Sequence, residues 1–245
     1  MRTALVRRAV LTASAASLAL LATACTSSGE AGPKADAKAS AKPSPSASPT
    51  PEAKALTAAE LEKATLADGD VPKVKIEKAG ADDVAKAAEV SSDKPECQPI
   101  ALVGSLAPVG KPVTTTERVG ATEPTDPTNL LSMTITAVQL QSYDGKGAEE
   151  ALASLKTAGQ ACAGGFVVTA KGEKTTIKSL VPATDAAGDD SVAWTVTMVQ
   201  DGETMNSRLV VLRKGNNLAS IQQVKFEGKA QTPQDFIDAQ LKKLG

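Results

Sequence analysis

The sequence contains no histidine and very few aromatic residues. Histidine is the usual general base of hydrolases and the commonest side-chain ligand of transition metals, so its absence disfavours both kinds of site. The aromatic side chains are one tyrosine, one tryptophan and three phenylalanines. Because sugar sites and single-stranded nucleic-acid sites depend on stacking against aromatic rings, these ligand classes are disfavoured as well. The core must be built from aliphatic residues and methionine.

The chain also lacks an excess of positive charge, with 27 lysine and arginine residues against 28 aspartate and glutamate residues. Three of the 27 basic residues lie in residues 1–24, a segment that we expect to be removed, which leaves 24 against 28. Proteins that bind nucleic acids carry clustered basic side chains, which release counterions from the phosphates. We therefore expect no nucleic-acid partner.

Residues 1–24 have the three parts of a bacterial export signal. Three arginines begin it, residues 9–21 form an apolar run rich in alanine and leucine, and residues 22–24 are small, as a signal peptidase requires. The apolar run is too short for a transmembrane helix. The pair Arg7 and Arg8 also resembles a twin-arginine signal, so two export routes remain open, the general secretory and the twin-arginine pathway.

Cys25 directly follows the small residues, and the stretch from Leu21 to Cys25 resembles the lipobox of bacterial lipoproteins. That motif usually has leucine three residues before the cysteine, where this chain has Ala22. The resemblance implies cleavage between Ala24 and Cys25 and diacylglycerol on the Cys25 thiol. Two buried acyl chains anchor a protein stably, so we expect the protein on the extracytoplasmic face of the cell membrane. The alternative is ordinary secretion with Cys25 as a spare thiol.

Residues 25–55 consist mainly of alanine, serine, proline and lysine. Such a segment cannot bury enough apolar surface to offset the entropy lost on ordering, so we expect a disordered, lipid-anchored linker. Residues 56–245 are long enough for a single globular domain with its own core.

Cys97 and Cys162 are the remaining cysteines. An even pair in an oxidising compartment predicts a disulfide, and two free buried thiols are the alternative. The bridge would close a loop of about 65 residues, worth about 4 kcal/mol in the chain-entropy model.

The hydrophobic spacing predicts an α+β fold. A capping box at residues 57–60 begins one helix, and apolar residues at helical spacing predict helices over residues 145–163 and 232–244. Turn residues at 201–202 and 215–217 separate alternating strands, as in hairpins. We expect an antiparallel sheet of about five to seven strands, with helices packed on one face and one disulfide.

In one predicted strand the alternation of apolar residues changes phase. Met133, Ile135 and Ala137 alternate on one phase, and Val138 and Leu140 continue on the other. This shift indicates either a β-bulge or a strand that is buried on both faces.

The sequence offers few candidates for catalysis or metal binding. Ser91 and Lys94 match the S-x-x-K pattern of β-lactamases, but that chemistry needs both residues on one helix and Pro95 disfavours helix at Lys94. The aspartate pairs in residues 68–70 and 189–190 could bind calcium, but they adjoin glycine in turns and lack further ligands. We expect no enzymatic activity, no metal and no cofactor.

Four large apolar side chains are candidates for a ligand-binding cleft between the sheet and its helices. They are Trp194, Met198, Met205 and Phe226. The alternative for Trp194 is simple core packing, because it alternates with apolar residues in the middle of a strand.

Several local features resemble known proteins. They are a cysteine-led helix over residues 97–106, a helix ending at Cys162, the mid-strand Trp194 and a hairpin over residues 209–218. On these, residues 57–244 resemble secreted lipoproteins of actinobacteria and, more distantly, the extracellular sensor domain of the mycobacterial receptor serine/threonine kinases. That family carries two disulfides and a cleft for a ligand, whereas this chain can form one disulfide.

The resemblance implies a membrane-anchored lipoprotein with a non-enzymatic ligand-binding or sensor-like domain. The alternative is a structural or protein-interaction lipoprotein, accessory to a cell-envelope complex. The expected partners are the membrane, through the lipid on Cys25, and either an unknown small ligand or an envelope protein.

The anchor predicts a defined mass. Protein purified from membranes should begin at Cys25 and carry a diacylglyceryl group on that residue, as measured by mass spectrometry. Cys25→Ser should move the protein from the membrane to the soluble fraction, whereas Thr26→Ser should leave it on the membrane. A mature chain without the adduct would contradict the assignment.

Overall fold

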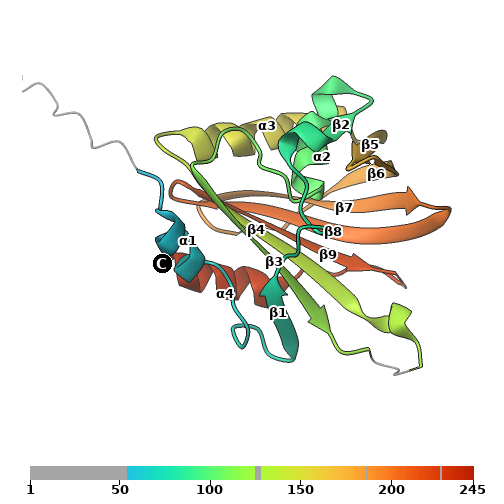
Figure 1. Ribbon diagram of the computed structural model, residues 1–245. Coiled ribbons are helices and arrows are strands. Elements are labelled where there is room, and N and C mark those ends of the chain that lie inside the picture. The colour runs from blue at the N-terminus through green and yellow to red at the C-terminus, as the bar shows by residue number, and fades with distance from the viewer. Residues whose placement is uncertain (1–53, 125–127, 186, 227) are drawn as a thin grey trace, which may run out of the picture. The chain divides into compact units, whose positions relative to one another are not determined.

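The computed structural model describes residues 54–124, 128–185, 187–226 and 228–245. The predicted export signal, Cys25 and nearly all of the predicted linker lie outside these residues. The described chain forms an α+β domain around one antiparallel sheet of nine strands (Figure 1). The strand order is β1-β3-β4-β9-β8-β7-β6-β5-β2, so the two short strands β1 and β2 are its edges.

Four α-helices and three short 3-10 helices accompany the sheet within the described ranges. No described helix is both long and apolar enough to cross a membrane. The helices are α1 (Ala58–Ala64), η1 (Ala87–Glu89), η2 (Pro95–Cys97), α2 (Gln98–Gly104), η3 (Leu130–Ser132), α3 (Gly147–Ala161) and α4 (Gln234–Leu244). The strands are β1 (Val74–Lys78), β2 (Val90–Ser92), β3 (Thr114–Thr122), β4 (Thr134–Ser142), β5 (Phe166–Ala170), β6 (Glu173–Ala183), β7 (Asp190–Gln200), β8 (Glu203–Lys214) and β9 (Asn217–Lys225).

The centre of the sheet is built from hairpins. β7 and β8 pair antiparallel, with Met198 opposite Met205, and Asp201 and Gly202 form the turn between them. Both turn residues have positive φ, 51° and 86°, as a type I′ hairpin turn requires. A second turn at Gly215 connects β8 to β9. The antiparallel hairpins that the sequence predicts are confirmed.

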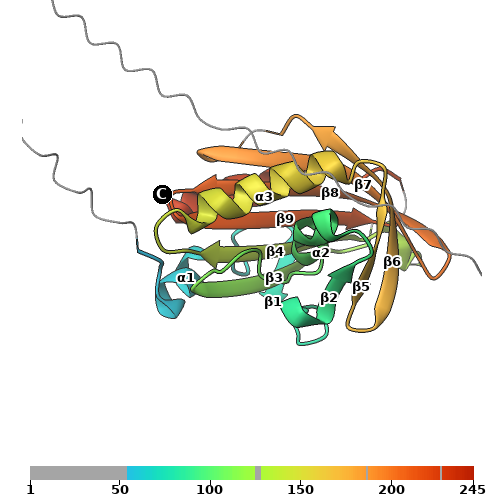
Figure 2. The same cartoon turned by 90° about the horizontal axis from the view of Figure 1, so that it is seen from above.

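Helices cover both faces of the sheet, and the prediction that they pack on one face is wrong. On β8, Leu209 and Val211 belong to the apolar core beneath α2 and α3, whereas Val210 and Leu212 belong to the core beneath α1 and α4. Figure 2 shows α3 and α2 together on one side. The prediction of five to seven strands is also wrong, because it undercounts the nine strands.

β4 explains the change of phase over residues 133–140. The strand pairs with β3 and β9 without any shift of register, so it has no bulge. Val138 and Leu140 are fully buried on the face of α1 and α4, and Gln139 and Gln141 are fully buried on the other. A strand buried on both faces loses the apolar and polar alternation that marks a one-sided sheet.

α3 packs closely on the sheet at a glycine. A Cβ atom added to Gly159 would lie 2.4 Å from a ring carbon of Trp194, so the indole occupies the space of the missing side chain. Trp194 is only 2% exposed. Leu152 and Leu155 continue the buried face of α3. Trp194 is therefore a core residue that positions α3.

The opposite face is held by a buried guanidinium group. Arg118 on β3 is 5% exposed; its Nε donates to the Leu66 carbonyl over 2.9 Å, and its Nη2 donates to Glu62 over 2.7 Å. Hydrogen bonding from Lys78, together with the charge of Arg118, lowers the pKa of the Glu62 carboxyl. Because a buried charge is costly without partners, these contacts fix α1 against the sheet.

The contact at Gly159 predicts that one added methyl group lowers the stability of the domain. Gly159→Ala should lower the free energy of unfolding by about 1–3 kcal/mol, because the Cβ atom would displace the Trp194 ring. Denaturant titration measures this change. Gly104→Ala is the matched control in α2, where nothing lies within 4 Å of the added atom, so its stability should be unchanged or higher. Equal effects of the two substitutions would contradict the packing.

Candidate functional site

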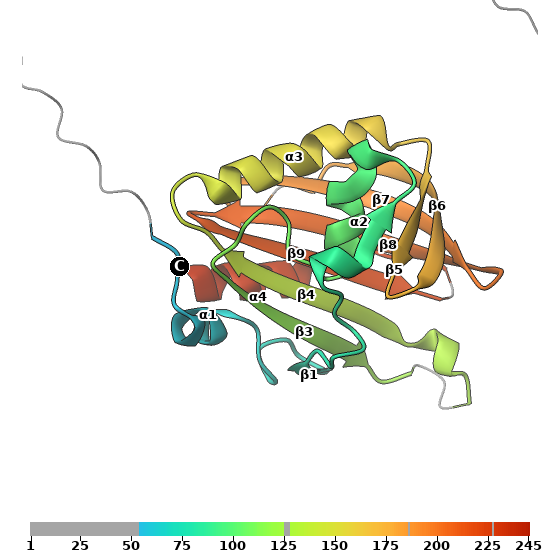
Figure 3. The same ribbon diagram turned by 45° about the horizontal axis from the view of Figure 1, so that its top comes forward.

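The described domain contains a cavity of about 340 Å³ between α2 and the sheet. Its volume lies in the range of small-molecule sites, about 300–1,000 Å³. Figure 3 shows α2 beside α3 over the same face of the sheet. The lining residues are Asp83, Ile100, Ala101, Gly104, Ser105, Leu106, Val119, Ile135, Ala137, Phe166, Val168, Ala170, Thr175, Ile177, Val196, Met198, Gln200, Met205, Leu209, Gln222 and Val224.

The cavity exists because α2 is short and two of its three lining residues are small. The helix has seven residues, and Ala101 and Gly104 are the ones that leave space above the strands. Ala137 on β4 is the small residue of the opposite wall. Val119 and Val224, on β3 and β9, are only partly buried there, because no helix covers them fully.

A strained residue follows α2 at the edge of the cavity. Leu106 has φ of 51°, in the left-handed region that leucine rarely adopts, at a cost of about 1–2 kcal/mol. Its carbonyl accepts a hydrogen bond of 2.7 Å from the Nε2 atom of the buried Gln139. This side chain therefore helps to hold the end of α2 over the sheet.

Gln139 belongs to a row of buried polar side chains on β4. The Nε2 atom of Gln141 donates to Gln139 over 2.9 Å, and Gln141 accepts from the Val109 backbone over 2.9 Å. The Tyr143 hydroxyl donates to the Val109 carbonyl over 2.8 Å. Burial raises the pKa of Tyr143, so this hydroxyl stays protonated. The row attaches the segment after α2 to the sheet, and sequence reasoning did not identify it.

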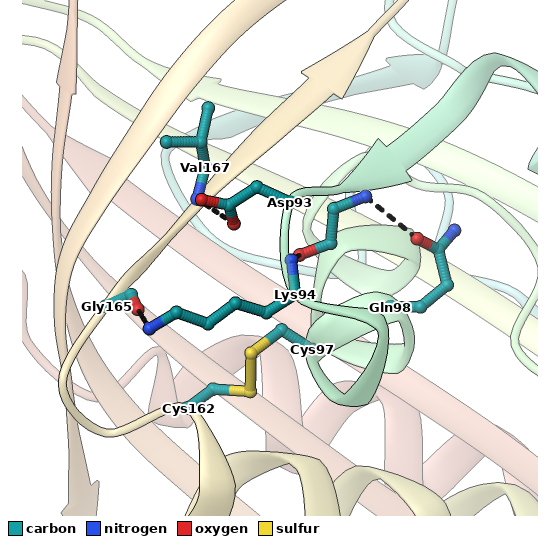
Figure 4. The surroundings of a disulfide bond; sticks show 8 residues. Asp93, Lys94, Cys97, Gln98, Cys162, Gly165 and Val167 are labelled. Atoms are coloured by element: carbon teal, nitrogen blue, oxygen red, sulfur yellow. Dashed lines mark hydrogen bonds between the residues drawn. A yellow bond between two sulfur atoms is a disulfide. The ribbon is translucent and has the colours of Figure 1, made fainter. Parts of the chain in front are cut away.

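The other end of α2 is held by the predicted disulfide, which is confirmed. Cys97 and Cys162 are both fully buried and bonded, with Cα atoms 5.8 Å apart (Figure 4). The bond joins the residue before α2 to the residue that ends α3. Beside it, Lys94 Nζ donates to the Gly165 carbonyl over 2.6 Å, and Asp93 accepts from the Val167 backbone over 2.8 Å. The start of α2 is thus attached to both α3 and β5.

The residues of the S-x-x-K match do not have the geometry of the β-lactamase motif. Ser91 is exposed on β2, where it pairs with Thr169 of β5. Lys94 has an extended backbone, with φ of −117° and ψ of 112°, and its ammonium group donates a hydrogen bond to the Gly165 carbonyl. The two residues therefore do not share a helix, which is what the chemistry of that motif requires.

The aspartates that could have bound calcium have other partners. Asp70 forms an ion pair of 2.6 Å with Lys243, whose hydrogen bond is the main cause of the lowered pKa of Asp70. Asp190 pairs over 2.6 Å with Lys156, which likewise lowers the pKa of Asp190. Asp189 accepts from the backbone of the turn between β8 and β9. No group of three or more potential metal ligands occurs in the described ranges.

The four residues predicted to line a cleft are only partly brought together. Met198 and Met205 face each other in the wall of the cavity. Trp194 does not line it, because that ring lies beneath α3. Phe226 does not line it either; it follows the last residue of β9 and is 37% exposed. The remaining lining comes from α2, from loop residues beside it, from β7 and β8, and from five other strands, which sequence periodicity could not bring together.

Comparison with known proteins gives matches among solved structures. No family model and no curated protein matches this sequence. A matching solved structure is the crystal structure of the extracellular domain of PknH from Mycobacterium tuberculosis. The match covers 78% of this chain and 96% of that chain, with a TM-score of 0.51 and 12% sequence identity. The distant resemblance predicted from the sequence is thus confirmed at the level of the fold.

The disulfide should make a large contribution to stability. It spans 65 residues, so the double variant Cys97→Ala/Cys162→Ala should lose about 4 kcal/mol of unfolding free energy, because its unfolded chain is no longer restrained. Denaturant titration measures the loss. Hydrogen exchange should show loss of protection in α2 before α4, since the bond holds α2 and α3 but does not touch α4. A loss below about 1 kcal/mol would contradict this role.

Proposed function

We propose that the chain is a membrane-anchored, extracytoplasmic lipoprotein whose domain binds an apolar small ligand without catalysing its conversion. The observation that carries the proposal is the cavity between α2 and the sheet, which is lined mainly by aliphatic side chains and two methionines. An apolar ligand would bury surface there that is now in contact with water, and such burial contributes about 25 cal/mol per Å².

The same lining favours binding over catalysis. Among the lining residues that the structure describes, Asp83 alone has a titratable side chain. A general acid–base pair or an activated nucleophile needs at least two such groups within hydrogen-bonding reach of each other. The rest of the described lining offers hydroxyl, amide and backbone groups, which orient a ligand but do not transfer protons at neutral pH.

The location and the sensor-like role are supported by the sequence signals and the fold. The resemblance of residues 21–25 to a lipobox supports a location outside the cytoplasm, where a disulfide such as Cys97–Cys162 is stable. The extracellular domain of PknH has a similar fold. A sensing role would require that ligand binding alters a surface that a second protein contacts. Leu106, the strained residue that follows α2, lines the cavity and would therefore contact a ligand there.

The alternative role, as a structural or protein-interaction lipoprotein, is less well supported. It requires a filled core and a contiguous exposed apolar patch. The exposed large apolar residues of the described chain include Val113 and Leu131, at opposite ends of the sheet. Val113 therefore shares no patch with Leu131, whereas the core contains a cavity.

Filling the cavity should weaken ligand binding. The uncharged dye N-phenyl-1-naphthylamine should bind the full chain carrying Cys25→Ser, with a rise in its fluorescence. Ala137→Phe places an aromatic ring in the cavity wall and should weaken this binding at least tenfold.

The control for this experiment is Ala153→Phe, the same substitution at an exposed position of α3. It should leave dye binding unchanged. Absence of dye binding to the parent chain, or equal binding by Ala137→Phe, would overturn the proposed function.

A further inference from the structure

The cavity has an uneven distribution of charge. Among its lining residues, all from the described part of the chain, Asp83 alone is charged and none is basic. A second pocket adjoins the cavity and shares five residues with it. We call it the outer pocket; it is lined by Asp82, Asp83, Ala85, Ser105, Ala170, Lys171, Glu173, Thr175 and Gln200.

The outer pocket carries three carboxylates against one ammonium group. That ammonium, Lys171 Nζ, donates to the Ala81 carbonyl over 2.8 Å and lies 3.8 Å from a carboxylate oxygen of Asp82. Lys171 is therefore engaged with residues 81–82. Its charge offsets that of Asp82, which leaves the carboxylates of Asp83 and Glu173 uncompensated.

Both remaining carboxylates have uncharged partners. Asp83 accepts a hydrogen bond of 2.8 Å from the Gly80 backbone, and Glu173 accepts one of 3.3 Å from Gln200. Neither forms an ion pair with a basic side chain of the described residues. Their charge is thus available to a ligand that extends from the cavity into the outer pocket.

We infer that the ligand is a cationic amphiphile, with an elongated apolar body in the cavity and an amine head group between Asp83 and Glu173 in the outer pocket. This inference rests on the proposed function. The shared residues, which include Ser105, Thr175 and Gln200, form the boundary between the two chambers and offer hydroxyl and amide groups to the head. An amphiphile of that shape uses both chambers at once.

The carboxylates of the outer pocket disfavour a ligand with an anionic head group. A carboxylate or phosphate head in the outer pocket would lie near the uncompensated negative charges of Asp83 and Glu173, while the charge of Lys171 is already offset by Asp82. Repulsion between like charges weakens binding, and this repulsion decreases as added salt screens the charges. Fatty acids and anionic lipids are therefore expected to bind more weakly than amines of equal length.

Three ten-carbon probes test the inference on the full chain carrying Cys25→Ser. Decylamine, decanol and decanoate share the apolar body and differ in the charge of the head. By calorimetry at low salt and neutral pH, decylamine should bind at least about tenfold more tightly than decanoate, with decanol between them. Added salt should reduce this ratio.

The double variant Asp83→Asn/Glu173→Gln removes both charges and keeps both hydrogen bonds, because the amide oxygens can still accept from Gly80 and Gln200. It should bring decylamine and decanoate to within about twofold of each other. The matched control is Glu149→Gln/Glu150→Gln in the first turn of α3, which lies at the opposite end of the sheet from Gln200. That pair should retain the parent ratio.

The outcomes separate the inference from the proposed function. Equal binding of all three probes by the parent chain would overturn the amine preference and leave apolar binding intact. Tighter binding of decanoate than of decylamine would also overturn it. Failure of all three probes to bind, together with failure of the dye, would overturn the proposed function itself.

Discussion

The burial of both faces of a single sheet is the constraint on which the rest of this structure depends. The central strands β4, β8 and β9 carry apolar side chains on two phases, so neither face can be left to water. An apolar face exposed on this scale would cost about 25 cal/mol for each Å². Four helices must therefore be divided between two faces, with α1 and α4 on one and α2 and α3 on the other.

That division leaves the face of α2 and α3 incompletely covered, and the cavity is the consequence. α3 packs tightly at Gly159, where the Trp194 ring replaces a side chain, so no space remains beneath it. α2 has only seven residues, and two of its three lining residues, Ala101 and Gly104, are small. The disulfide from Cys97 to Cys162 prevents α2 from moving away at its start, and Gln139 holds the segment at its end. Attachment at both ends, with small residues at the lining between them, leaves a cavity rather than a collapsed core.

Much of the secondary structure followed from the sequence, because local chemistry determines it. The capping box at Thr57, the glycine turns of the hairpins and the helical spacing before Cys162 are signals within a few residues of one another. The phase shift in β4 was also visible, and it contained the information that both faces are buried. The α+β class was predicted correctly for this reason, and the disulfide because only two cysteines remained to pair. The number of faces covered was not predicted, since it depends on where helices that are distant in the sequence return to the sheet.

The site was less predictable than the fold, for the same physical reason. Met198 and Met205 were found because a hairpin turn brings them together, which is a local event. Ala101 and Ala137 line the cavity by being small, and a small residue gives no sign in the sequence of the space above it. Asp83 and Glu173 come from separate segments that meet only where α2 ends over the sheet. The position of α2 therefore decides both the shape of the cavity and the charge at its boundary.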